Sequence, residues 1–409
     1  MPDVSVARRS KTTLGHVDGD LEIESDAVIT SEGEMVTVDG QVRIEGNVVF
    51  EGGLKAGRLE ADDGDLDIHG QLTIEDGVHV SDGNLHVAGS LFARDVDVDR
   101  HLEVLGDVTV TNLEVGSRAA VRGSLKAKSV EVGGSLEVQG TAMVEDIDVG
   151  GSVRVAKEVN CGSIDVGGSV IVGGGKIADE IDVGGSFEST APLEFNELEV
   201  GGSAQLKGDS RGRRIDVGGF FSVKGPGSLT FEDIDVGGTI EIDGNAQGEE
   251  ADVGGVFRVR GDLALTGRLE VGGKCEISGT LTANRIEIGG WLEAEEIKVG
   301  DIEVGGSIVT KRGVRGDSIS IGDRGRVRGP LIGNEIRIGE RAEVEALYGK
   351  SIHMEERCRA ETVQGVDIKI ESGSRIRGEV LYSGSLEADE DVTFAVEPKK
   401  VDSLPSAPS

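Results

Sequence analysis

Three cysteines and six histidines carry the most reactive side chains of this chain. Cys161, Cys275 and Cys358 could serve as nucleophiles or metal ligands if a histidine shared their part of the fold. Each instead occupies a position that is Val, Leu or Phe in neighbouring segments, and no histidine has a suitable spacing. We therefore expect all three to be small core residues, and we expect no resident metal or cofactor.

The histidines are dispersed along the chain, at His16, His69, His79, His86, His101 and His353. His79 and His353 each stand between two apolar residues, which is the outward position of a strand. No Ser-His-Asp or Cys-His arrangement follows from the spacing of any of them. Placement on the surface accounts for the histidines, and the sequence predicts a protein that is not an enzyme.

Carboxylates show the most regular spacing of any charged group. One acidic residue recurs in thirteen successive segments, at Asp97, Glu114, Glu131, Asp148, Asp165, Asp182, Glu199, Asp216, Asp235, Asp252, Glu270, Glu287 and Glu303. Stacked in register, these carboxylates would form a stripe that opposes strand pairing and needs mobile counterions. We expect diffuse cation association along its middle, at Asp148, Asp165, Asp182, Glu199, Asp216, Asp235 and Asp252.

The elements that position this stripe are set by an internal repeat. An apolar-charged-apolar tripeptide followed by Gly-Gly recurs along the chain, and its second apolar residue serves as a marker. Eight markers follow each other at one constant interval: Val98, Val115, Val132, Val149, Val166, Val183, Val200 and Val217. Further markers run back to Ile23 and on to Ala388 at similar spacings, with one longer step from Ile23 to Ile44.

Each repeat contains three short runs in which apolar and polar residues alternate, which is typical of strands. Strands of three or four residues are too short for independent hairpins, so we expect each repeat to form one triangular coil that stacks on the next. The prediction is an all-β protein, a single long three-faced parallel β-helix of about 22 coils of about 17 residues. At the corners, we expect Gly-Gly to supply positive φ angles.

Composition narrows the functional class. The 409 residues include 65 glycines, 3% aromatic residues and a formal net charge of −34. That charge argues against nucleic acid as a partner, because 76 carboxylates face only 42 cations and no basic patch is segregated. No apolar stretch is long enough to cross a membrane, and the first residues lack a secretory h-region, so we expect a cytoplasmic protein.

The repeat predicts three regions. Residues 1–13 form a flexible N-terminal tail, residues 14–394 form the β-helix, and residues 395–409 form a flexible tail containing Pro and Ser. Arg8, Arg9 and Lys11 could make a weak contact with an anionic membrane surface.

Three segments carry a resemblance to a known family. They read ISIGDRGRVRG at 319–329, IRIGERAEV at 336–344 and IKIESGSRIRG at 368–378. These segments resemble the repeat of the bactofilins, the polymer-forming cytoskeletal proteins, over residues 314–388. The resemblance implies a right-handed, three-faced β-helix that self-assembles into filaments without nucleotide and serves as a cellular scaffold. This chain has many more coils than a typical member, and its length is similar to that of archaeal relatives.

The two ends of such a β-helix are where assembly is expected. A terminal coil has unpaired strand edges and an uncovered apolar interior, which favour the addition of another chain. The predicted contact residues are Leu21, Ile23 and Val28 at one end, and Leu386, Val392 and Phe394 at the other. The expected partner is therefore a second copy of this chain, bound end to end.

Two alternatives fit the same coils. A monomeric rod could act as a spacer or an interaction surface if its tails cover the terminal coils. A hexapeptide-repeat acyltransferase also has three-faced coils, but it requires a six-residue hydrophobic period, a protruding loop and a well-placed histidine. The sequence matches these three features poorly.

Overall fold

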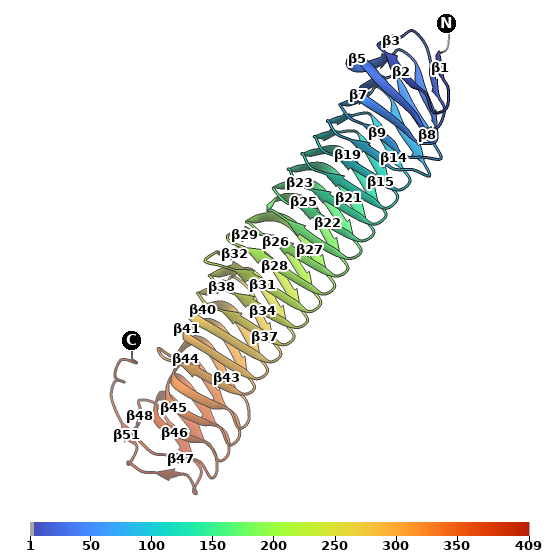
Figure 1. The fold of residues 1–409 in the computed structure, drawn as a ribbon. Helices are drawn as coiled ribbons and strands as arrows, with labels where there is room; N and C mark the ends of the chain where they lie inside the picture. The colour runs from blue at the N-terminus through green and yellow to red at the C-terminus, as the bar shows by residue number, and fades with distance from the viewer. Residues whose placement is uncertain (1–3, 409) are drawn as a thin grey trace. The chain divides into compact units, whose positions relative to one another are not determined.

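The computed structural model describes residues 4–408, and it confirms the predicted all-β class (Figure 1). Parallel strands stack into a β-solenoid of about 23 turns with a spacing of about 17 residues. No helix occurs among residues 4–408, so this part of the chain offers no apolar helix that could span a membrane. Packing contacts divide the chain into an N-terminal unit, Met1–Leu206, and a C-terminal unit, Lys207–Ser409. We describe each unit by itself.

Each turn has three faces, which we call A, B and C. Face A carries the marker tripeptide, as in the second half of β19 (Leu125–Val132). Face B follows the glycine corner, as in β20 (Ser135–Val138). Face C comes third and often runs straight on into face A, as in β21 (Ala142–Val149). Figure 1 shows β19, β21, β23 (Val159–Val166) and β25 (Gly175–Val183) following one another in the stack.

Face A sets the register of each unit. Val98 pairs with Val115 in the N-terminal unit, and Ile370 pairs with Ala388 at the far end of the C-terminal unit. In the N-terminal unit, the strands of face A that carry the acidic stripe are β14 (Asp95–Val98), β17 (Asn112–Val115), β19, β21, β23, β25 and β27 (Leu193–Val200). In the C-terminal unit they are β30 (Arg214–Val217), β33 (Asp233–Val236), β36 (Glu250–Val253), β39 (Arg268–Val271), β40 (Lys274–Ile288) and β41 (Trp291–Val304).

The core consists of inward columns with one residue per turn. On face B of the C-terminal unit, Phe257 pairs with Cys275, and Cys275 pairs with Leu292. All three side chains are fully buried. Because the pairing is parallel and in register, a single alternating pattern repeated once in every turn builds the whole column.

The glycine corners differ from our expectation in their physical cause. The glycines of the regular corners, such as Gly151, Gly168 and Gly185, are not among the described glycines with a positive φ. What excludes a side chain there is the turn below. A Cβ on Gly168 would lie 2.3 Å from the carbonyl oxygen of Gly151, and one on Gly151 would lie 2.4 Å from that of Gly134. The corners therefore need glycine for close approach rather than for a left-handed backbone.

A left-handed backbone occurs instead at another type of corner in the C-terminal unit. Arg324, Arg341 and Arg357 have φ values of 57°, 60° and 57°, and Gly373 has 72° one turn later. Non-glycine residues rarely adopt such angles, and glycine adopts them freely. The pattern IxIGxR ends at two of these corners, at Arg324 and Arg341, but it is absent at Arg357 and Gly373.

The first turn begins earlier than the predicted boundary at residue 14. β1 (Val4–Val6) pairs with β4 (Leu21–Ile23), and β2 (Lys11–Leu14) pairs with β5 (Ala27–Val38). The prediction of a flexible N-terminal tail is therefore wrong for residues 4–13. These residues lack the marker tripeptide followed by Gly-Gly on which the prediction relied, although apolar and polar residues still alternate in Val4–Val6. Residues 1–3 lie outside the described residues. The long step from Ile23 to Ile44 has its origin in β5, whose register shifts between Thr30 and Met35.

The predicted C-terminal tail also contains ordered structure. β51 (Lys399–Lys400) pairs with β48 (Val380–Tyr382) and continues face C by one strand. Beyond it, the chain turns back along the C-terminal unit, since Val401 N donates to Tyr382 O in β48 and Pro408 O accepts a hydrogen bond from Arg315 (Figure 1). The flexible tail expected at 395–409 is therefore wrong for Lys399 and Lys400, which form a strand, and Ser409 lies outside the described part of the chain.

Candidate functional site

The acidic stripe of the N-terminal unit exists as the sequence predicts. On face A, Asp148 pairs with Asp165, Asp165 with Asp182, and Asp182 with Glu199. The column continues in the other direction through Glu131 and Glu114 to Asp97. Adjacent strands of a sheet lie about 4.8 Å apart, so each carboxylate between Glu114 and Asp182 has a like charge on the strand above it and on the strand below it.

The C-terminal unit carries its own acidic stripe. Asp216, Asp235 and Asp252 occupy one column, which continues through Glu270, Glu287 and Glu303. Desolvation raises the pKa of the Asp235 carboxyl, and the charges of Asp252 and Asp216 raise it further. Burial is the largest single cause of this shift, and the charges of Asp252 and Asp216 follow it.

Counterions are also supplied by the chain itself. Arg268 Nη1 lies 2.7 Å from Glu270 Oε2, and Arg285 Nε lies 2.6 Å from Glu287 Oε1. Each arginine stands two residues before its glutamate on the same strand, so neutralisation occurs within a turn. The carboxylates form a column rather than a convergent cluster, which suits diffuse association of cations better than coordination of one ion.

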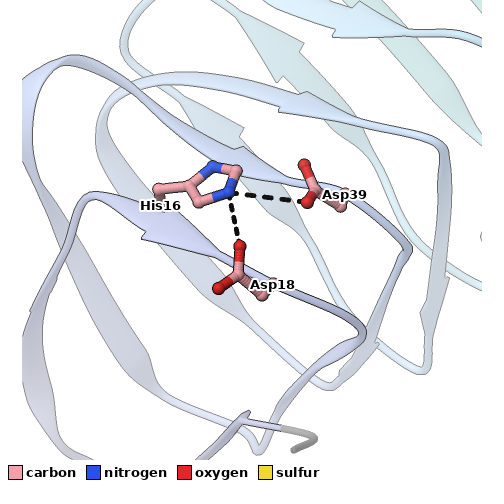
Figure 2. Close-up of side chains that lie close together, drawn as sticks. All are labelled: His16, Asp18 and Asp39. Atoms are coloured by element: carbon pink, nitrogen blue, oxygen red, sulfur yellow. Dashed lines mark hydrogen bonds and ion pairs between the residues drawn. The ribbon is translucent and has the colours of Figure 1, made fainter. Parts of the chain in front are cut away.

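A convergent donor set occurs elsewhere, near the N-terminus (Figure 2). His16 Nε2 lies 2.7 Å from Asp18 Oδ1 and 3.5 Å from Asp39 Oδ2. β3 (His16–Val17) pairs with β5, and this pairing brings Asp39 alongside from the next turn. The three groups are of the type that binds divalent transition metals. All three are exposed, however, and the imidazole pairs with both carboxylates.

Sequence reasoning missed this set because its spacing depends on the irregular step. Asp18 and Asp39 are separated by the same long step as Ile23 and Ile44, whereas the repeat elsewhere has a spacing of about 17 residues. Only the extra residues of β5 bring the two carboxylates together. A His-x-Asp pair just before the long step is the signal that could have found it.

The other histidines with close partners make contacts between turns. His79 Nδ1 lies 2.8 Å from Asp97 Oδ2, and His353 Nε2 lies 2.8 Å from Glu371 Oε1. Both imidazoles are partly exposed, which confirms their outward placement. In each pair the acid comes from the following turn, so the histidine links two coils rather than orienting a nucleophile.

The three cysteines are core residues, as predicted. Cys161 is 8% exposed, and Cys275 and Cys358 are fully buried. Burial raises the pKa of the Cys161 thiol to about 12 and that of Cys358 to about 11, and it raises the pKa of Cys275 as well. Thiols with such pKa values are protonated at neutral pH and react slowly.

The N-terminal contact residues lie one turn inside the end that we predicted. Leu21 pairs with Val4 and Ile23 pairs with Val6, so β1 covers both, and neither is more than 2% exposed. Val28 pairs with Lys11 and is half-buried. The placement of Leu21 and Ile23 at the open end is therefore wrong, because β1 supplies the outermost layer on their face.

The cations that we considered for membrane contact lie in this outer layer. Arg9 Nε lies 3.4 Å from Asp26 Oδ2, and Lys11 Nζ lies 2.8 Å from Glu51 Oε2. Arg8 Nε is 3.8 Å from the same Asp26 oxygen. Contact with an anionic membrane stays a prediction, and it would have to compete with these ion pairs.

The C-terminal contact residues do lie in the last turn. Leu386, Val392 and Phe394 are half-buried. β49 (Leu386–Ala388) pairs back to β46 (Arg359–Ile370), and β50 (Thr393–Phe394) pairs back to β47 (Arg375–Ile376). Within residues 4–408, no later strand follows β49 or β50 in its column, so this end presents apolar side chains beside open strand edges.

Comparison with known proteins adds no identity to these features. No protein-family model matches the chain, and no curated protein or solved structure gives a significant match.

Proposed function

We propose that this chain is a non-enzymatic structural protein that assembles end to end into a scaffold, in the manner implied by its resemblance to the bactofilins. The observation that carries the proposal is the last turn, where Leu386, Val392 and Phe394 are half-buried beside strands that have no successor in the described chain. An uncovered coil of a parallel β-helix offers a second copy both backbone hydrogen bonds and an apolar layer.

The chemistry of the other groups supports a structural role. The thiols are buried and protonated, and His79 and His353 are paired with carboxylates between turns. A hexapeptide-repeat acyltransferase would need a histidine placed beside an acceptor site, and these two already lie within 2.8 Å of carboxylate oxygens. We propose further that the protein works in the cytoplasm and that its strong negative charge keeps neighbouring assemblies apart sideways.

The experiment compares Phe394→Asp with the matched substitution Phe92→Asp. Phe92 is 38% exposed in β13 (Leu91–Phe92), on the side of the N-terminal unit rather than at an end. We expect the wild-type chain and Phe92→Asp to form filaments in electron microscopy and large species in sedimentation velocity. Phe394→Asp should give short particles, because a buried charge at the contact costs several kcal/mol. Long filaments of Phe394→Asp, or a monomeric wild-type chain, would contradict the proposal.

A further inference from the structure

The chain beyond β51 follows a defined path along the C-terminal unit. Val401 N donates a hydrogen bond to Tyr382 O at 2.9 Å. At the other end of the segment, Arg315 Nη2 donates to Pro408 O at 2.6 Å. Arg315 belongs to β43 (Val314–Ile321), which lies four turns before Tyr382. Residues 401–408 therefore cross the strands of face C and return over earlier turns.

The length of this crossing fits an extended chain. Val401 follows β51, which lies one strand beyond β48, so five steps between adjacent strands separate it from Arg315, about 24 Å in all, and the long Arg315 side chain bridges part of this distance. Seven residue steps from Val401 to Pro408 span about 22 Å in the polyproline II conformation and about half of that in an α-helix. Val401, Leu404 and Ala407 are half-buried, and the residues between them are exposed. Burial at every third residue matches the three residues per turn of polyproline II, and Pro405 and Pro408 favour that conformation.

The surface beneath the segment is unusual for this solenoid. The outward column that begins at Arg315 continues as Ile332, Tyr348, Gln364 and Leu381. Ile332, Tyr348 and Leu381 are large apolar or aromatic side chains. By contrast, the same outward column earlier in the C-terminal unit holds the smaller or polar residues Thr230, Gln247, Ala264 and Thr282. Leu381 is only 7% exposed although it points away from the core.

The segment is held by few contacts. The backbone of residues 401–408 is tied to the solenoid by the hydrogen bonds at Val401 and Pro408, and two further half-buried side chains lie between these ties. Beneath it, Gln364 Oε1 is buried without a hydrogen-bond partner among the described residues. A segment that is tied by two hydrogen bonds, has no fully buried side chain and leaves a buried acceptor unpaired opens at small cost in free energy.

We propose that the column from Arg315 to Leu381 is a groove for an extended, proline-containing peptide, and that residues 401–408 exchange between this groove and the same groove of a second copy. Apolar side chains at every third position fill the groove, and the Arg315 guanidinium binds a peptide carbonyl. The exchange does not require the proposed end contacts, because the tail of one copy can reach the groove of another wherever two C-terminal ends meet. Swapping an identical segment creates the same contacts in trans without a new interface.

The groove is tested with a fluorescent peptide of residues 401–409 and the chain 1–400, which keeps β51. Fluorescence anisotropy should show saturable binding to 1–400, and binding to the full chain about tenfold weaker or more, because the tethered segment competes at high effective concentration. The peptide with Leu404→Asp should not bind. Tyr348→Asp in 1–400 should abolish binding, whereas Met143→Asp, at a 53% exposed position of β21, should leave it unchanged. Absence of saturable binding to 1–400, or equal binding of the Leu404→Asp peptide, would contradict the proposal that this column binds the peptide.

Exchange is tested with two complementary chains, both carrying Phe394→Asp so that end contacts are disabled. One has an intact tail and Tyr348→Asp, and the other is 1–400 with an intact groove. Sedimentation velocity should find each chain monomeric and their mixture partly heterodimeric. Peptide binding without heterodimers would contradict exchange of the tail between copies, but it would still support a peptide-binding groove. Because the end contact is absent from both chains, this result does not depend on whether filaments form.

Discussion

At the scale of single residues, the glycine corners show how contact between successive turns restricts which residue a position can hold. The corner glycines of the regular repeat sit against the backbone carbonyl of the residue one turn earlier, as Gly168 does against Gly151 and Gly134 does against Ser117. A side chain at one corner would push that turn away from its neighbour. The constraint therefore acts between turns, and it explains why glycine recurs at the period of the repeat rather than at isolated bends.

Gly168→Ala should consequently destabilise the protein by about 1–3 kcal/mol, because the new Cβ would lie 2.3 Å from backbone that cannot move without disturbing its own turn. Gly33→Ala is the matched control, since a Cβ there has no atom within 4 Å. Urea denaturation monitored by circular dichroism measures both. Equal stability of the two variants would show that the corners tolerate a side chain.

The cysteines give a second prediction at this scale. At pH 8, thiols with pKa values raised to about 12 and about 11, as for Cys161 and Cys358, are almost entirely protonated. Native protein should therefore react with a thiol reagent only as it opens, whereas unfolded protein should label three thiols at once. Phe92→Cys adds an exposed thiol and should label immediately, with one equivalent. Rapid labelling of the wild-type native chain would contradict the core placement.

At the scale of elements, the acidic stripe is held in place by the columns behind it. Asp235 lies between Asp216 and Asp252, and its carboxylate keeps its outward position because Ile234 and Val236 on either side are buried. The buried apolar residues thus fix the register of the strands, and this register places the carboxylates of the stripe next to one another despite their repulsion. At these positions the repulsion between neighbouring carboxylates opposes the pairing of the strands, but the burial of the adjacent apolar side chains outweighs it.

Asp235→Asn should relieve part of this conflict at pH 7. A folded pKa raised above the unfolded value means that the folded state binds more protons between the two pKa values. The stability is then full below the unfolded pKa of about 3.9 and falls as the pH rises through the folded pKa. We expect Asp235→Asn to raise the melting temperature at pH 7. The gain in the free energy of unfolding should be only about 0.5 kcal/mol, because the side chain is exposed to solvent, and neither quantity should change at pH 3.

Asp209→Asn provides the control of opposite sign. Two hydrogen bonds from Ser228, first from its backbone N–H and then from its hydroxyl, lower the pKa of Asp209. Removing the Asp209 carboxylate should therefore lower the melting temperature at pH 7. A melting temperature of Asp235→Asn at or below the wild-type value at pH 7 would contradict a penalty on the charged Asp235 carboxylate from burial and neighbouring like charges.

These elements also show what sequence could predict. The strands, the face A register and the acidic stripe follow from alternation repeated about every 17 residues, because a parallel stack turns a period into a column. The set His16, Asp18 and Asp39 could not be predicted, because it depends on extra residues inside β5. The segment 401–408 could not be predicted either, since its partners Arg315 and Tyr382 are set by three-dimensional stacking rather than by any local pattern.

At the scale of the whole molecule, charge is the dominant property. The net charge of −34 makes the chain repel itself, most strongly where carboxylates share a column. Diffuse screening and coordination at discrete sites predict different responses to salt. Screening depends on ionic strength alone, whereas coordination favours divalent ions at equal ionic strength.

We expect the melting temperature to rise between about 0.05 and about 1 M ionic strength, and to rise equally in NaCl and MgCl₂, because the stripe is a column without convergent ligands. The triple variant Asp148→Asn, Asp165→Asn and Asp182→Asn should flatten this rise, since it interrupts three adjacent members of the column. The control changes Glu34, Glu75 and Glu158 to Gln, which removes the same net charge from exposed, scattered positions. If both triple variants respond to salt alike, stacking of the carboxylates contributes nothing beyond net charge; if MgCl₂ stabilises far more than NaCl, the protein binds divalent cations at defined sites.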